Sequence, residues 1–177
     1  PGLKALIEAA GLSDAALTAG NIGFQLAPRL NAGGRIGSAK RSYDLLAATE
    51  PAEAATIAAE LEEENRTRRD VEEQIQLEAE AQLESFDFPA HRALVLAGKD
   101  WNPGVIGLTA SRLVEKYHYP TILLSERDGV LTGSCRSIPG VDIHAALTAV
   151  KHLLVKYGGH RQAAGLTLTA DHLDDFR

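Results

Sequence analysis

The sequence predicts an α/β protein in which a long helix leads into a mixed sheet covered by helices. Three observations support this fold class. Residues 51–84 have the composition and periodicity of one long helix. After residue 88, short apolar runs alternate with amphipathic segments, as in strands and helices packed in layers. Before residue 49, the periodic segments are short and helical. We therefore expect a helical beginning, a connecting helix and an α/β sandwich.

The first part of the chain predicts short helices separated by turns. Their apolar residues recur at helical spacing, and they cover residues 3–10, 18–26 and 39–48. The second helix should end before Pro28, because proline disfavours a helical conformation in the residue before it. The segment 31–38, Asn-Ala-Gly-Gly-Arg-Ile-Gly-Ser, contains three glycines and is predicted to be a loop.

The long helix predicted over residues 51–84 has the features of a bridge. Its apolar residues recur mostly at four-residue spacing near both ends, whereas residues 62–70 are polar on every side. At 1.5 Å per residue this helix would reach ~50 Å, more than the width of a small domain. A helix that is apolar at both ends and polar between them suits a connection between two lobes. A coiled-coil dimer is the alternative, but the apolar repeat lapses for too long to favour it.

The last part of the chain predicts the sheet. Apolar or turn-bounded runs of strand length cover residues 93–97, 121–125, 129–137 and 166–169. Helices are expected over residues 104–118 and 142–157, and the second would end at Gly158-Gly159 as a helix C-cap. Because strands alternate with helices, we expect an α/β sandwich with a mixed sheet.

Composition indicates a globular protein without a membrane span or signal peptide. Hydrophobic residues make up 45% and charged residues 24% of the chain, which is ordinary for globular domains. No apolar run approaches the roughly 18 to 20 residues of a membrane helix. One cysteine cannot form an internal disulfide, so the cytoplasm is the simplest location. The chain lacks methionine and begins and stops within helical segments, so we expect an interior fragment of a longer protein.

The net charge of −6 by itself argues against a nucleic-acid partner, but the charge is unevenly distributed along the chain. Residues 50–84 hold 12 acidic and 3 basic residues. The other residues hold 15 basic and 12 acidic residues. Since the acidity belongs to the long helix, the average charge does not exclude nucleic acid.

No complete catalytic set is visible, and the six histidines lack metal-site spacing. Three basic segments beside glycines or small residues suggest phosphate binding instead, because arginine forks and backbone N–H groups suit that anion. The candidate residues are Arg29, Asn31, Arg35, Ser134, Arg136, Ser137, Gly158, Gly159, His160 and Arg161. Each segment also has a structural interpretation, as a helix cap, a tight connection or an ion pair. The residues alone leave both interpretations open.

Four segments that occur in order resemble the RecJ family of single-stranded-DNA-specific exonucleases, within the DHH phosphoesterases. They are Arg-Leu-Asn-Ala-Gly-Gly-Arg at 29–35, Trp-Asn-Pro-Gly-Val-Ile-Gly at 101–107 with Ala-Ser-Arg-Leu at 110–113, Gly-Ser-Cys-Arg-Ser-Ile-Pro-Gly at 133–140, and Gly-Gly-His-Arg-Gln-Ala-Ala-Gly at 158–165. The Gly-Gly-His motif is typical of the wider superfamily. The Asn-Ala-x-Gly-Arg and Ser-Cys-Arg-Ser motifs narrow the resemblance to RecJ.

The resemblance implies a parent enzyme that removes nucleotides from the 5′ end of single-stranded DNA, in repair and recombination. It implies two divalent metals, manganese or magnesium, held by ligands that include an Asp-His-His signature. That signature is absent, so the ligands should lie before Pro1, and this chain should hold no metal and be inactive alone. A helicase or single-strand-binding protein would be a candidate partner of the parent. The implied parts are the end of the catalytic domain (1–48), a connecting helix (49–88) and a DHH-associated domain (89–177).

The resemblance also implies roles for the basic residues. Arg35 and His160 would act near the cleavage site, with Arg29 and Asn31 supporting the loop around Arg35. Arg136 and Ser137 would hold the 5′ phosphate of the strand. Two alternatives are a relative that cleaves short oligoribonucleotides or cyclic dinucleotides, and a non-catalytic interaction module. The long helix and the Ser-Cys-Arg-Ser motif favour the exonuclease over the first.

Overall fold

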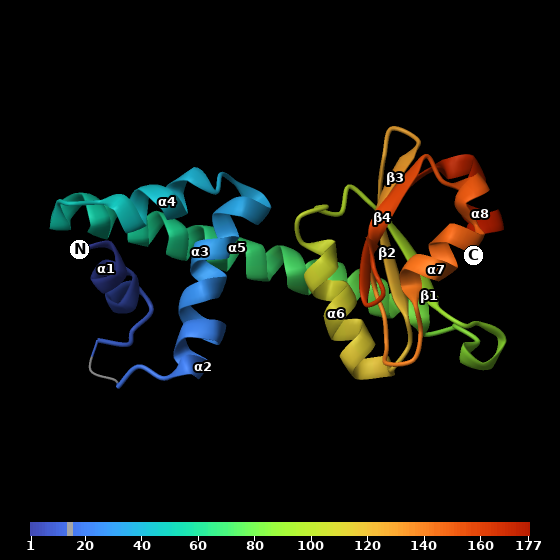
Figure 1. Cartoon of the computed structure of the whole chain (residues 1–177), viewed down its shortest axis with the longest axis horizontal. Coiled ribbons are helices and arrows are strands. Elements are labelled where there is room, and N and C mark those ends of the chain that lie inside the picture. Colours follow the sequence, from blue (N-terminus) through green and yellow to red (C-terminus); the bar gives the residue numbers. More distant parts are fainter. Residues whose placement is uncertain (14–15) are drawn as a thin grey trace. The chain divides into compact units, whose positions relative to one another are not determined.

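The computed structural model describes residues 1–13 and 16–177 and divides into two compact units, Pro1–Asp70 and Val71–Arg177. Figure 1 labels their helices and strands. The predicted long helix is confirmed as α5, Pro51–Leu83, whose residues belong in part to each unit. No helix in the described part of the chain combines the length and hydrophobicity that crossing a bilayer requires.

The first unit is helical, as predicted. Besides α5 it contains α1 (Gly2–Ala9), α2 (Ala19–Asn21), a π-helical turn (Ile22–Leu26), α3 (Ala27–Ile36) and α4 (Lys40–Ala47). Thr18 caps α2 by accepting the N–H of Asn21, as expected of an N-cap threonine. Leucines from the helices and from the turn after α1 form the core of this unit, together with Leu61 of α5: Leu6, Leu12, Leu26 and Leu45.

The loop predicted over residues 31–38 is wrong, because residues 31–36 belong to α3. Glycine lowers helix propensity, but here it permits close packing. A Cβ on Gly33 would lie 2.7 Å from the Ser38 carbonyl oxygen and 3.0 Å from Glu64 Oε2. The expected helix end before Pro28 is also wrong. A π-helical turn, Ile22–Leu26, precedes this proline. Proline has no N–H to donate in an ordinary helical turn, and we attribute the continuation of the helix to the wider turn before it.

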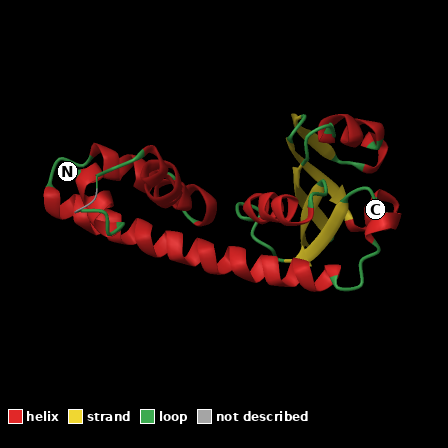
Figure 2. Ribbon diagram, turned by 90° about the horizontal axis from the view of Figure 1, so that it is seen from below, coloured by secondary structure: helices red, strands yellow, loops and turns green. Residues whose placement is uncertain are grey.

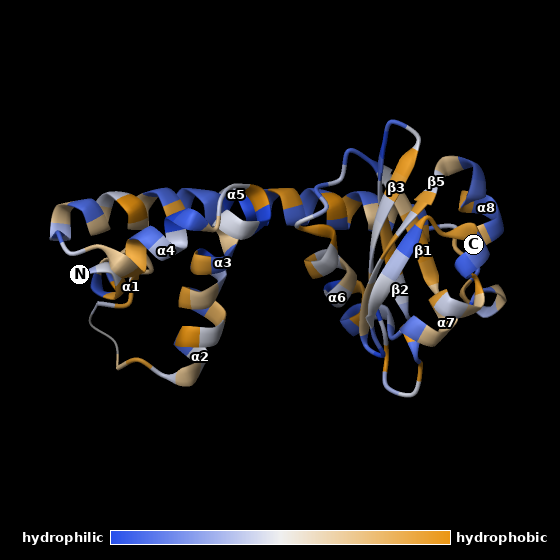
Figure 3. Ribbon diagram, turned by 45° about the horizontal axis from the view of Figure 1, so that its top comes forward, coloured by the Kyte–Doolittle hydropathy of each residue, from blue (hydrophilic) through white to orange (hydrophobic). Residues whose placement is uncertain are grey.

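Helix α5 has a buried stripe that continues through its polar middle. Polar and apolar residues alternate toward both ends of α5 (Figure 3), and residues 62–70 between them are all polar. The buried positions recur every three or four residues: Ala54, Ala58, Leu61, Asn65, Arg68, Glu72, Ile75 and Ala79. Polar side chains therefore continue the stripe where apolar ones stop.

The second unit contains a five-stranded mixed sheet, which confirms the predicted fold class. Its strands are β1 (Leu94–Lys99), β2 (Thr121–Arg127), β3 (Val130–Arg136), β4 (Lys156–His160) and β5 (Ala163–Thr169). Their order is β1-β2-β3-β5-β4. Only the β1–β2 pair is parallel; the other pairs are antiparallel.

Helices lie on both sides of this sheet (Figure 2). They are α6 (Ile106–Tyr117), α7 (Ile143–Ala149) and α8 (Leu173–Phe176), with short 3-10 turns at Phe88–Ala90, Lys151–Leu153 and Ala170–His172. Side chains of α7 and α8 pack with Leu131 and Cys135 of β3. Because side chains alternate along a strand, Ser134 and Arg136 face the opposite side, where α6 packs on β2 and β3.

The single helix predicted over residues 142–157 is wrong. Helix α7 ends at Ala149, and Lys156–His160 forms the edge strand β4. The Val155 N–H donates to the Thr167 carbonyl at 2.8 Å, where the pairing of β4 with β5 begins. Gly158 and Gly159 therefore lie within a strand and do not end a helix. Cross-strand pairing prevails here over a local pattern that resembles a helix.

Candidate nucleic-acid interface

The second and third basic motifs meet on one face of the sheet. In the strand register, Arg136 of β3 pairs with Ala163 of β5, which pairs with His160 of β4. Directly paired residues point to the same face. Arg136 and His160 therefore share the face on which α6 lies, about 10 Å apart at two strand spacings.

Arg136 lies against the first turn of α6. Its Nη1 donates to the Cys135 carbonyl at 2.8 Å and to Ser134 Oγ at 3.2 Å. A Cβ on Gly107 would lie 2.8 Å from Ser134 Oγ and 2.9 Å from Arg136 Nη2. Both side chains are half-buried. The guanidinium thus stands beside the N–H groups that open a helix, and both attract an anion.

The tip of the β4–β5 hairpin is tied to the segment that follows Arg136. The Ser137 N–H donates to the Gln162 carbonyl at 2.9 Å, and the Ile143 N–H donates to the Arg161 carbonyl at 3.1 Å. Arg161 and His160 are exposed at this tip. His160 Nδ1 lies 3.4 Å from the Gln162 N–H, from which it accepts a weak hydrogen bond. These bonds fix the third motif beside the second.

Ser137 stabilises a turn in this structure. Its hydroxyl donates to the Val141 carbonyl at 2.9 Å, and the residue is buried. For the expected phosphate contact, the Ser137 hydroxyl would have to donate to the phosphate instead of to the Val141 carbonyl. Ser134, by contrast, has a half-buried hydroxyl that accepts from Arg136. Of the two serines, Ser134 is the better placed beside the guanidinium.

The two glycines of the third motif differ in what the fold requires. Gly159 has a φ of +145°, and a Cβ there would overlap the backbone of Ala163 and Ala164. The fold therefore requires glycine at this position. A Cβ on Gly158 would meet nothing within 4 Å. Gly158 is exposed and has no such requirement.

The first motif lies on α3 in the other unit. Arg29 is buried and pairs through Nε with Glu62 of α5, and its Nη1 donates to the Gln25 carbonyl at 2.7 Å. This arginine therefore ties α3 to α5. Asn31 is exposed and Arg35 is half-buried on the same helix. These contacts hold Arg29 between two helices, not beside a loop, and the expected phosphate contacts of Arg29, Asn31 and Arg35 stay predictions.

Trp101 anchors the loop that leads into α6, a feature not assigned from the sequence. Its Nε1 donates to Glu78 Oε2 of α5 at 2.7 Å, and its indole lies where a Cβ on Gly98 would be. The hydrogen bond from Trp101, followed by one from Gln74, lowers the pKa of the Glu78 carboxyl. The sequence signals were a lone tryptophan beside Asn-Pro-Gly and a glycine, Gly107, inside a predicted helix.

Comparison with known proteins agrees with this architecture. Residues 90–177 match the DHHA1 domain family. The chain is 38% identical to the single-stranded-DNA-specific exonuclease RecJ of Dickeya dadantii, over 100% of this chain and 32% of that protein. It is 39% identical to RecJ of Bacillus subtilis, over 99% of this chain and 22% of that protein. The crystal structure of Thermus thermophilus RecJ with Mg²⁺ superposes with a TM-score of 0.86, at 33% identity over 99% of this chain and 27% of that one.

The chain belongs to the RecJ family. Sequence and fold agree over nearly its whole length, whereas it spans only about a third or less of the relatives named here. The resemblance inferred from the four motifs is thereby confirmed.

A divalent metal of the kind bound in the Thermus RecJ crystal does not fit the residues described in this RecJ-family chain. Within residues 1–13 and 16–177, no three or more histidine, cysteine, aspartate or glutamate side chains gather as a metal site requires. The lone Cys135 is buried, and burial raises the pKa of its thiol to about 12. No chemical step is therefore assigned to a metal held by these residues.

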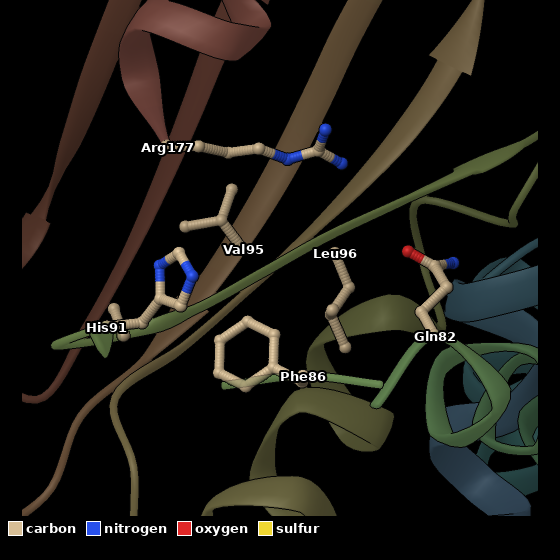
Figure 4. A pocket seen from close by; sticks show the side chains of 7 residues that line it. Gln82, Phe86, His91, Val95, Leu96 and Arg177 are labelled. Carbon is tan, nitrogen blue, oxygen red and sulfur yellow. The ribbon is translucent and has the colours of Figure 1, made fainter. Parts of the chain in front are cut away.

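A hollow in this RecJ-family chain lies at the other edge of the sheet, beside β1 (Figure 4). It is lined mainly by apolar and aromatic groups, including Phe86, Val95 and Leu96, with Arg177 at one side. Gln82 donates to the Ala97 carbonyl there, at 3.0 Å. Since β1 and β4 are opposite edges of the sheet, this hollow is separate from the basic motifs.

Proposed function

We propose that this chain is the strand-holding part of an exonuclease that digests single-stranded DNA from its 5′ end. The observation that carries the proposal is the convergence of Arg136 and His160 on one sheet face, with Arg136 packed on the first turn of α6. The names of the relatives support single-stranded DNA as the substrate.

The proposed grip acts through charge and positioning. Arg136 offers a planar fork of N–H donors that matches two oxygens of one phosphate. The opening turn of α6 adds backbone donors beside it. His160, two strands away on the same face, would contact the strand near the scissile phosphate. Holding the strand at two points fixes the reacting phosphate and removes much of the entropic barrier to its hydrolysis.

The proposal divides the chain into three parts. Residues 1–48 would complete a catalytic domain, 49–88 would connect it, and 89–177 would bind substrate. Two manganese or magnesium ions would be held by residues outside this chain and would activate the attacking water. The relatives crystallised with Mg²⁺ or Mn²⁺ support that choice of metals. We further propose a role in DNA repair and recombination in the cytoplasm, with a helicase or single-strand-binding protein as candidate partner.

Turnover by the whole protein tests this function. Arg136→Ala and His160→Ala should each lower kcat/KM on a 5′-phosphorylated single strand by about 10- to 100-fold, because each removes a charge-assisted hydrogen bond. Thermal unfolding should stay unchanged. Arg127→Ala is the matched control, since Arg127 is exposed and pairs only weakly with Asp100. If both variants kept wild-type kinetics, the motifs would have only a structural role.

A further inference from the structure

Two glycines face each other across the β4–β5 pair at the edge of the sheet, and the fold requires neither. Gly158 of β4 pairs directly with Gly165 of β5. A Cβ on Gly158 would meet nothing within 4 Å, and one on Gly165 would make only ordinary contact, 3.6 Å from the Gly133 carbonyl oxygen. Both residues are exposed, so neither packing nor an unusual φ explains them.

A glycine inside a strand costs stability, because it loses more backbone freedom on folding than other residues do. Glycines that serve no internal contact often mark a place where a ligand or another backbone comes close. The pair at 158 and 165 forms the floor of a shallow groove over β3, β5 and β4. Two rows of side chains cross the strands on either side of this floor, and we call them its walls.

The first wall is the row that contains Arg136 and His160, two residues along each strand from the glycine floor and on the same face. The wall at the other end is the row in which Thr167 of β5 pairs with Thr132 of β3 and Lys156 of β4. Thr132 and Lys156 are exposed. Thr167 is buried between them, and its Oγ1 has no hydrogen-bond partner in the described structure. The second wall thus offers one exposed cation, Lys156, and one exposed hydroxyl, Thr132.

The composition of the three strands favours a polyanion. None of the residues of β3, β4 and β5 is acidic, whereas Arg136, Lys156 and His160 are basic. Their only large aromatic residue, Tyr157, pairs with the core residue Leu166 and contacts His144 of α7, so it lies on the opposite face. Without an aromatic platform, the groove suits a sugar–phosphate backbone better than stacked bases.

The two walls are spaced for separate phosphates. Lys156 and His160 are four residues apart on β4, or about 13 Å along an extended strand. A stacked nucleic-acid strand advances ~3.4 Å per nucleotide, so this distance covers about four nucleotides, and fewer in a stretched strand. One phosphate cannot reach both walls.

We propose that the glycine floor is a track for the backbone of the bound strand, and that Lys156 and Thr132 hold a second phosphate two to four nucleotides from the one held by Arg136. This inference rests on the proposed function and adds a subsite to it. The glycines let the backbone lie directly on the sheet between the two phosphates. Binding there would be independent of base sequence.

A scan with neutral methylphosphonate linkages tests the track. A 5′-phosphorylated oligothymidylate of about twelve nucleotides carries one neutral linkage at each successive position, and its affinity for the full chain is measured by fluorescence anisotropy at low salt. The wild-type chain should lose affinity at two positions separated by two to four nucleotides. Lys156→Ala should abolish the sensitivity at the second position only. Lys99→Ala, an exposed lysine at the end of β1, is the matched control.

Each outcome is decisive. One sensitive position, or two that both persist in Lys156→Ala, would overturn the second subsite and leave the first. Loss of the first position in Arg136→Ala would show that the proposed grip stands independently. No sensitive position in the wild-type chain would contradict the proposed function itself. Gly158→Val should also erase the second position without lowering the melting temperature, since its side chain would enter the groove and not the core.

Discussion

Gly107 controls where the guanidinium of Arg136 can lie. It sits in the first turn of α6, and any side chain there would overlap both Ser134 Oγ and Arg136 Nη2. Both atoms end mobile side chains, so they could move aside without disturbing the backbone. The glycine therefore acts on the position of the arginine more than on the stability of the fold.

Gly107→Ala should weaken binding of a 5′-phosphorylated single strand by about tenfold, because displacing the guanidinium removes about one charge-assisted hydrogen bond. The free energy of unfolding should change little, since alanine favours the helix by up to about 1 kcal/mol while the contact opposes it. Anisotropy and urea unfolding measure the two effects. Wild-type affinity in this variant would mean that Arg136 binds equally well from another position.

At the level of residues, the sequence identified the basic side chains of the candidate site but not how they are arranged. The basic motifs were identifiable because arginine and histidine beside glycines are few in this chain. Their partners were not, since the Arg29–Glu62 pair joins residues 33 apart. Gly158 and Gly159 look equivalent in sequence, and only the three-dimensional structure shows that the second alone is required by the fold.

At the level of elements, α5 is attached to α6 by polar contacts within the second unit. Arg112 of α6 pairs with the buried Glu72 at 2.8 Å, and Lys116 pairs with Glu80 at 2.8 Å. The hydrogen bond between Trp101 and Glu78 holds the loop before α6 to the same helix. These contacts position the opening turn of α6, on which Arg136 rests.

Trp101→Phe should raise the pKa of the Glu78 carboxyl back toward its ordinary value, because the indole N–H is the main cause of its lowering. A lowered pKa in the folded state means that this carboxylate stabilises the fold above the ordinary carboxyl pKa. That contribution is lost as pH falls through the lowered pKa. Titration of the Glu78 side chain by NMR measures the change. An identical titration curve in both proteins would show that the hydrogen bond does not form in solution.

Elements with strong local patterns were predicted from the sequence, and those fixed by distant pairing were not. The apolar runs of β1 and β2 and the periodicity of α5 and α6 are local signals. Strand β4 forms because it pairs with β5, and its sequence, Lys-Tyr-Gly-Gly-His, has little strand propensity of its own. The helical segment continues past Pro28 into α3 because a π turn, Ile22–Leu26, precedes the proline, and no local propensity indicates that turn.

At the scale of the whole molecule, net charge gives a poor guide to the partner. Several acids of α5 are engaged in ion pairs, among them Glu62, Glu64, Glu72 and Glu80. The strands that form the candidate interface contain bases and no acids. An acidic chain can therefore present a local surface that attracts a polyanion.

The central claim is that the face carrying Arg136 and His160 binds single-stranded DNA. The most direct measurement is fluorescence anisotropy of a labelled, 5′-phosphorylated single strand titrated with this chain at low salt, beside a duplex and the Arg136→Ala variant. We predict salt-sensitive binding that favours the single strand and weakens by about 10-fold or more in the variant. Equal affinity of the wild-type and variant chains for the single strand would contradict the claim.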